Sequence, residues 1–149
     1  MRKFIPLTVV LAAVAALSLG GIATSKPKPP PKPKPKLELL TETEEAALRK
    51  RAIKVEVVSR RGKDVRAEAT FVVDGFPEDF VFKLGPDREK LTDNDATIRF
   101  PLSARKREVL DFAIKSCRGA TVDVRAEVGR GNASLHRALA MPADCQAGG

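Results

Sequence analysis

The stretch Val65–Val73, with the sequence VRAEATFVV, decides the fold class of this chain. Every second residue in it is apolar, and most of the residues between are polar or charged. A period of two is typical of a strand that buries one face. The stretch Ile53–Val57 alternates in the same way, and the turn-forming segment Arg60–Asp64 separates the two. We therefore predict two strands paired as a hairpin with one buried face.

Further strands are predicted downstream. Phe80, Phe82 and Leu84 alternate in a strand that Gly85–Pro86 should end. Residues 87–95 then form a charged loop. Alternation also predicts strands over 96–102, 121–128 and 133–141. The last two are joined through residues 129–132 as a tight hairpin, because glycines flank that turn.

A short helix is predicted before the first strand, within residues 37–51 and principally over 41–51. Thr41 and Glu44 have the spacing of a capping box, in which both side chains bind free backbone amides. Acidic residues begin this segment and three basic residues, 49–51, end it. That order of charges matches the helix dipole.

Residues 103–118 fit either a strand or a helix. As a strand, Leu110, Phe112 and Ile114 alternate; as a helix, Leu110 and Ile114 share one stripe with Cys117. The length of the segment favours the helix. Ser103 would be its N-cap and Gly119 its stop.

The amino-terminal 36 residues differ from the rest. A basic start, an apolar run over 4–19 and small residues ending Ala23-Thr24-Ser25 are typical of an export signal over 1–25. Residues 26–36, KPKPPPKPKPK, predict a disordered linker extended as polyproline II, because proline fixes φ and lacks an amide donor. Residues 37–149 would form a single domain. An uncleaved signal would instead anchor the protein in a membrane.

The positive charge of the chain lies mostly in these 36 residues. The chain has 27 Lys and Arg against 19 Asp and Glu. Seven of the cations precede residue 37 and all of the acids follow it, which leaves a domain with 20 cations and 19 acids. The domain also has neither Trp nor Tyr on which bases or sugar rings could stack. No specific nucleic-acid partner is therefore expected.

Cys117 and Cys145 are the only cysteines. In an exported chain two cysteines indicate one disulfide, with two unpaired thiols as the alternative. A metal site is disfavoured because two sulfurs need further ligands, and the chain has one histidine.

The carboxyl-terminal half resembles a known kind of module. The sequence Leu102-Ser103-Ala104-Arg105, then Val109-Leu110, 121–127 (TVDVRAE) and Gly131-Asn132, is similar to secreted bacterial immunoglobulin-like β-sandwich modules with a helix before the last hairpin. The resemblance covers most of residues 41–141. It implies a mainly β, immunoglobulin-like sandwich of about six or seven strands with one or two short helices. It also implies an adhesive, spacer or surface role without catalysis.

Three groups of polar residues were candidate sites. Asp93-Asn94-Asp95, near Asp87 and Glu89, offers oxygens to calcium, or else forms a solvated turn. His136 lacks the sequence context of a catalytic triad or a zinc site. The triplet 105–107 is either the solvated face of a helix or a contact to anionic polymer. With no catalytic motif, we expect neither an enzyme nor a cofactor or metal.

The functional expectation is therefore an exported, non-enzymatic adhesive or spacer domain, secreted or in the cell envelope. Its linker would contact an anionic envelope polymer or a membrane surface through five lysines: Lys26, Lys28, Lys32, Lys34 and Lys36. The alternative is a secreted ligand-binding or inhibitor module that uses loops at one end of the sandwich to bind a protein partner.

Overall fold

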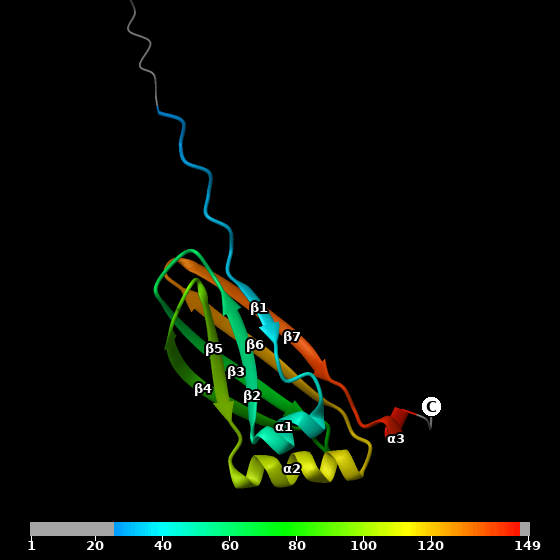
Figure 1. Ribbon diagram of the computed structural model, residues 1–149. Helices are drawn as coiled ribbons and strands as arrows, with labels where there is room; N and C mark the ends of the chain where they lie inside the picture. The colour runs from blue at the N-terminus through cyan, green and yellow to red at the C-terminus, as the bar shows by residue number, and fades with distance from the viewer. Residues whose placement is uncertain (1–25, 147–149) are drawn as a thin grey trace, which may run out of the picture. The chain divides into compact units, whose positions relative to one another are not determined.

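The computed structural model describes residues 26–146 and shows a mainly β chain (Figure 1). The chain divides into two compact units, Met1–Pro30 and Pro31–Gly149. The described residues of the first unit, 26–30, are exposed and have no regular secondary structure. All strands and helices given below belong to the second unit.

Two antiparallel sheets pack against each other in the second unit. The three-stranded sheet has the order β1-β2-β5, and the four-stranded sheet has the order β4-β3-β6-β7. The strands are β1 Lys36–Leu39, β2 Ala52–Val58, β3 Asp64–Val73, β4 Phe80–Lys90, β5 Asp95–Pro101, β6 Ala120–Val128 and β7 Gly131–Leu139. The helices are α1 Glu44–Lys50, α2 Ala104–Lys115 and α3 Ala143–Gln146. Both α1 and α2 lie at the end of the sandwich opposite to the one where residues 31–36 enter (Figure 1).

The core lies between the sheets, and β3 contributes a full row of side chains to it. The five alternating residues from Val65 to Val73 are at most 4% exposed, as their period of two predicted. Phe71 and Phe100 are the largest fully buried side chains and come from opposite sheets. Burial of this apolar surface is the main force that holds the sheets together.

The predicted hairpin between the first two long strands is wrong. Strand β2 pairs with β1 and β5, whereas β3 pairs with β4 and β6 in the other sheet. Alternation specifies which face of a strand is buried, and both strands do bury one face. It does not specify the pairing partner, and the turn at residues 59–63 crosses from one sheet to the other.

Strand β4 does not end at Gly85–Pro86 as predicted. The register with β3 shifts between Ala67 and Ala69, and the bulge takes in Gly85, at φ +83°, and Pro86. A bulge accommodates a residue without an amide donor, so the strand continues to Lys90. The predicted charged loop is accordingly shorter. Phe80, the first of the three alternating apolar residues in this strand, is 38% exposed.

Helix α1 begins later than predicted. Its N-cap is Thr43, whose Oγ1 accepts a hydrogen bond from the Ala46 amide at 3.0 Å. Thr41 is buried, and its hydroxyl instead accepts from the Lys54 amide at 3.0 Å. The predicted capping box is therefore wrong. The sequence Thr-Glu-Thr-Glu offers two capping residues in succession, and the formation of β1 just before them selects the second.

Residues 103–118 contain a helix, as favoured. Leu110 and Ala113 of α2 are buried, and Ser103 is the N-cap, although its side chain makes no capping hydrogen bond. The helix ends before the predicted stop at Gly119. Cys117 takes the left-handed conformation at φ +50°, and the Arg118 amide donates to the Ala113 carbonyl at 2.9 Å. This is the Schellman pattern with cysteine in the position that glycine usually takes.

The last hairpin is confirmed, with Gly129 and Arg130 as its turn. Strand β7 begins at Gly131, two residues before its predicted start. In the described part of the chain, no helix combines the length and the apolar character needed to cross a membrane.

Candidate anionic-surface site at the arm junction

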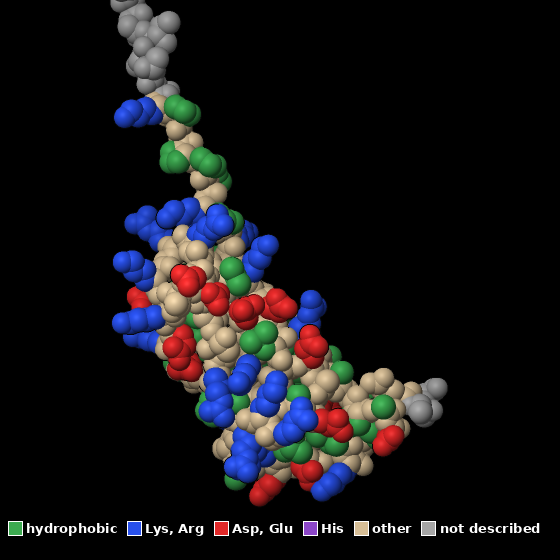
Figure 2. Space-filling view, in the orientation of Figure 1, with side chains coloured by type: hydrophobic (Ala, Val, Ile, Leu, Met, Phe, Trp, Pro, Cys, Tyr) green, Lys and Arg blue, Asp and Glu red, His purple; other side chains and the backbone are tan. Residues whose placement is uncertain are grey.

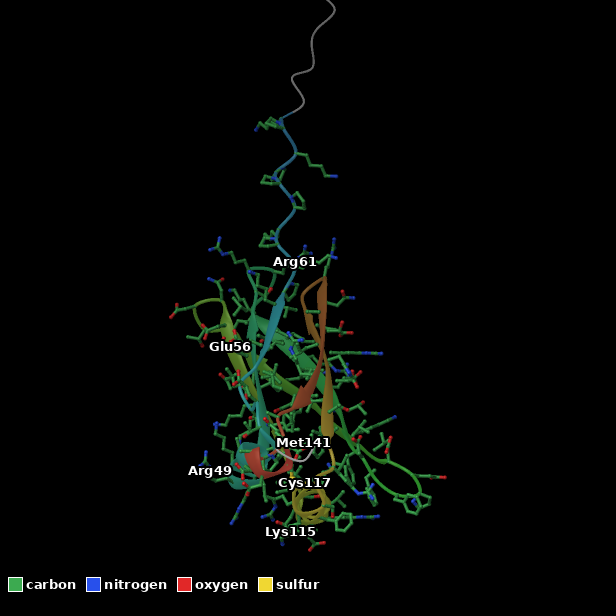
Figure 3. The ribbon with its side chains drawn as sticks, turned by 90° about the vertical axis from the view of Figure 1, so that its right-hand side faces the viewer. Arg49, Glu56, Arg61, Lys115, Cys117 and Met141 are labelled. Atoms are coloured by element: carbon green, nitrogen blue, oxygen red, sulfur yellow. A yellow bond between two sulfur atoms is a disulfide. The ribbon has the colours of Figure 1, made fainter. Side chains whose placement is uncertain are left out.

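The segment 31–36, which we call the arm, accepts hydrogen bonds from one arginine of the sandwich. Arg61, in the turn between β2 and β3, donates from Nε to the Pro33 carbonyl at 2.7 Å. Its Nη2 donates to the Lys32 carbonyl. Figure 3 shows Arg61 beside the arm. Both hydrogen bonds use backbone atoms of the arm, and the side chains of its lysines are exposed.

Glycines let the arm and two turns approach closely. A Cβ on Gly131 would lie 2.5 Å from Cδ of Arg61 and 3.0 Å from Cδ of Pro35, which is buried. Gly129 has φ +57°, and a Cβ there would lie 2.8 Å from the Arg61 carbonyl oxygen. The β6–β7 turn therefore packs directly on the β2–β3 turn. Residues 31–36, predicted as a disordered linker, belong to this packed unit.

Cations gather at this end of the sandwich. Arg60 and Lys63 are exposed in the β2–β3 turn, and Arg130 is exposed in the β6–β7 turn. Figure 2 shows blue Lys and Arg side chains grouped where the arm enters, with a band of red Asp and Glu below them, and a second blue group mixed with red at the opposite end. No acidic residue occurs in the β2–β3 turn (59–63), in the β6–β7 turn (129–131) or in the arm (31–36). The result is a positive end on a domain that is almost neutral overall.

Acidic groups mark the limit of this positive end. The β4–β5 turn carries Asp93 and Asp95 and lies beside the β2–β3 turn, because the Ser59 amide donates to the Asn94 carbonyl at 2.8 Å. Asp64 follows the β2–β3 turn in the sequence, and Glu127 lies just before the β6–β7 turn. The positive surface therefore extends from the turns toward the arm and not across the whole end.

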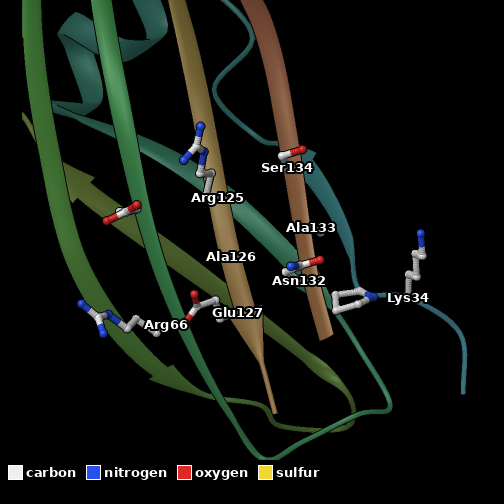
Figure 4. A pocket seen from close by; sticks show the side chains of 10 residues that line it. Lys34, Arg66, Arg125, Ala126, Glu127, Asn132, Ala133 and Ser134 are labelled. Carbon is white, nitrogen blue, oxygen red and sulfur yellow. The ribbon is translucent and has the colours of Figure 1, made fainter. Parts of the chain in front are cut away.

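A groove of about 790 Å³ adjoins the arm on the outer face of the four-stranded sheet (Figure 4). Lys34, Arg66 and Arg125 line it together with Glu68 and Glu127. In the register of the sheet, Arg66 is opposite Glu127 and Glu68 is opposite Arg125. Opposite charges in neighbouring positions stabilise the strand pairing and cancel each other's field. The groove is therefore less suited to an anionic ligand than the turns are.

The five predicted lysines fall into two groups. Lys32, Lys34 and Lys36 are exposed on the packed arm, and Lys36 is also the first residue of β1. Lys26 and Lys28 are exposed in the other unit. The predicted export signal, residues 1–25, lies outside the described residues.

The predicted disulfide between Cys117 and Cys145 is present, with the two Cα atoms 5.2 Å apart. It joins Cys117, two residues beyond the end of α2, to Cys145 of α3, and so fixes the carboxyl-terminal tail near Met141 to the helix end of the sandwich (Figure 3). A disulfide-bonded domain is consistent with an extracytoplasmic location.

The acidic candidates for calcium separate in the structure. Asp87 and Glu89 lie in β4, whereas Asp93 and Asn94 form a tight turn with φ of 52° and 75°. Positive φ at two successive residues is typical of two-residue hairpin turns, which supports the turn interpretation. Among the described residues, no three His, Cys, Asp or Glu side chains come together as metal ligands.

His136 lies on the exposed face of β7. Its Nδ1 is 2.5 Å from Oδ1 of Asp123, its cross-strand neighbour. Ser134 lies in the same groove, of about 730 Å³, but no hydrogen bond joins it to the histidine. The pair is an exposed cross-strand contact without an assembled nucleophile.

Members of the basic triplet on α2 have structural contacts. Lys106 Nζ donates to the Lys83 carbonyl of β4 at 3.3 Å, and Arg107 Nε is buried without a hydrogen-bond partner. Arg118 Nη1 donates to the Gly75 carbonyl at 2.8 Å. Among these four residues, only Arg105 is exposed. These contacts favour the structural interpretation of the triplet over a polymer contact.

The sequence did not reveal that Glu44 is buried. Glu44, at the start of α1, is 0% exposed, and neither carboxyl oxygen has a hydrogen bond of normal geometry. The pKa of this carboxyl is raised from its ordinary 4.5 to about 7, chiefly because burial disfavours the charged form. The charge of Asp74 contributes to the rise, and a hydrogen bond from the backbone amide of Ala120 acts in the opposite direction. An acidic residue in a first helical turn is usually exposed, so the sequence carries no signal for this burial.

No protein-family model matches the chain, and no curated protein matches it. The class that the structure defines is a mainly β domain of two packed antiparallel sheets with one disulfide.

Proposed function

We propose that this protein is an exported, non-enzymatic adhesive or spacer domain of the immunoglobulin-like kind. It would be held on anionic material of the cell envelope by the lysine- and proline-rich segment 26–36, whose second half is the arm. The observation that carries the proposal is the attachment of the arm through its backbone: Arg61 binds two carbonyls and leaves the lysine side chains exposed. The arm is thereby presented with its charges available.

The expected attachment is weak and reversible. A Lys or Arg near an anionic surface contributes about 1 kcal/mol, and the contribution falls as salt screens the field. Only some of the five lysines contact the surface at one time, and the affinity that they give falls as the ionic strength rises. Such an attachment suits a spacer that must remain exchangeable on a charged polymer.

The test replaces all five lysines of residues 26–36 by glutamine in the full chain. We expect retention on isolated envelope material to fall sharply and to lose most of its dependence on salt. The matched control replaces the same five lysines by arginine, which keeps the charge and the proline pattern. If the glutamine variant is retained as well as the unmodified chain at every salt concentration, these lysines are not the attachment.

A second candidate, a module that binds a protein partner, rests on exposed aromatics at the other end of the sandwich. Phe76 is 81% exposed and Phe112 is 54% exposed. Phe76 follows Gly75, whose carbonyl binds Arg118 just after α2, so this loop is tied to the helix end. Under this hypothesis, Phe76→Ser with Phe112→Ser would abolish capture of a single envelope protein by the full chain. The arm variants would not change that capture.

A further inference from the structure

The arm is one part of a larger positive surface that includes folded residues. The two basic turns and the arm meet around Gly129 and Gly131, so their relative positions are fixed by packing. A recess of about 460 Å³ lies between the arm and the β6–β7 turn. Lys32 and Arg130 line this recess from its two sides.

We propose that this surface binds a linear polyanion whose phosphate or carboxylate groups pass from the arm, through the recess, onto the turn cations Arg60, Lys63 and Arg130. The proposal rests on the proposed function and deepens it, because it names the class of partner and adds folded residues to the site. Arg61 is a positioning residue here: its guanidinium holds the arm, and the neighbouring cations contact the polymer.

The shape of the surface favours a polymer over a flat lipid surface. Lys32 and Arg130 line the recess, and Arg60 and Lys63 are exposed in the adjoining β2–β3 turn, so a flexible chain can place one anionic group after another along these cations. A planar layer of headgroups contacts only the most protruding side chains and cannot enter the recess. The nearby groove, in which Arg66 and Arg125 lie opposite acids, gives the polymer no comparable path.

The experiment measures binding of the full chain to fluorescent long-chain polyphosphate over a series of salt concentrations. The test variant is R60Q/K63Q/R130Q. The matched control is R49Q/K50Q/R105Q, which removes the same charge from exposed residues of α1 and α2 at the other end of the sandwich. Equal melting temperatures and circular dichroism spectra of the two variants show that both are folded.

Each lost cation should weaken binding roughly fivefold, so the loss of all three would weaken it at most about 100-fold. We expect the turn variant to bind polyphosphate at least about tenfold more weakly. Its plot of log affinity against log salt should also lose about two units of slope, by analogy with three contacts to a flexible single strand. The control variant should stay within about twofold of the unmodified chain. Equal weakening by the two triple variants would mean a net-charge effect and would overturn the proposal.

Vesicles of phosphatidylglycerol and phosphatidylcholine are the second ligand tested in the experiment. A polymer site predicts a larger effect of R60Q/K63Q/R130Q on polyphosphate than on vesicles; the reverse order would place the surface on lipid and refute the polymer. The variant with glutamine at all five lysines of residues 26–36 separates the two proposals. If it loses binding while the turn variant keeps it, the arm attachment stands and the folded surface is wrong. If neither variant changes binding, both proposals fail.

Discussion

Replacing the buried Glu44 by glutamine should remove a pH dependence from the stability of this domain. Glu44 is fully buried, and its pKa is raised from 4.5 to about 7 in the folded state, first by burial and then by the charge of Asp74. The folded state therefore holds a proton that the unfolded state releases between these pH values. The contribution of Glu44 to stability is therefore greatest below pH 4.5, falls as the pH rises through about 7, and is constant above that range.

The size of the effect follows from the shift. One pKa unit corresponds to about 1.4 kcal/mol, so a shift from 4.5 to about 7 costs the unmodified protein up to about 3 kcal/mol above pH 7. In Glu44→Gln the side chain is neutral at every pH and this loss is absent. The difference between the two proteins should thus be small and constant at acid pH, and should grow with pH in favour of the variant.

The assay is urea unfolding of both proteins at intervals from pH 4 to pH 8, because other carboxylates titrate alike in both and cancel in the difference. Glu45→Gln, an exposed change on the same turn of α1, supplies the control and should follow the unmodified protein. Curves for Glu44→Gln and the unmodified protein that stay parallel within about 0.5 kcal/mol would refute the reasoning. They would mean that the carboxylate is hydrated, or paired, in solution.

Three further predictions concern the arm, the disulfide and the core. Arg61→Lys keeps the charge but loses the two-pronged geometry that binds the arm carbonyls, so ¹⁵N order parameters of the arm lysine amides should fall without a change in net charge. Equal order parameters would contradict the clamp. Cys117→Ser with Cys145→Ser removes a link across 28 residues and should lower the free energy of unfolding by about 3 to 4 kcal/mol in urea titration. Phe100→Ala should cost about 3 to 5 kcal/mol in the same titration, whereas Phe76→Ala, at 81% exposure, should cost under about 0.5 kcal/mol; similar costs would mean that the burial is wrongly assigned.

The sequence predicted the properties of each segment better than the relations between segments. Alternation identified the buried row of β3 because a period of two is a local property of a strand. The same pattern could not decide that β2 and β3 belong to different sheets, since that choice depends on which faces pack together. The capping box failed for a related reason. Thr41 and Thr43 are equally good caps in isolation, and the strand before them decides between the two.

The candidate site shows the same division. The lysines of the arm were visible as a pattern, but the clamp that positions them was not, because Arg61 is separated from Pro33 by 28 residues and no local signal links the two. Arg60, Lys63 and Arg130 looked like ordinary turn residues for the same reason. Only the close approach of turns around glycine brings them beside the arm.

The near-neutral net charge of the domain therefore does not measure its electrostatic character. Twenty cations and 19 acids could be intermixed, as they are in the groove beside β6, and would then attract nothing at a distance. At the arm end the cations occupy adjacent turns and the acids lie beyond them, so the field adds instead of cancelling. A polyanion approaching the arm would meet a surface whose positive charge continues onto the fold. Neutralising three turn residues should then matter more than their share of the total charge implies, and the matched triple variant at the helix end tests that difference.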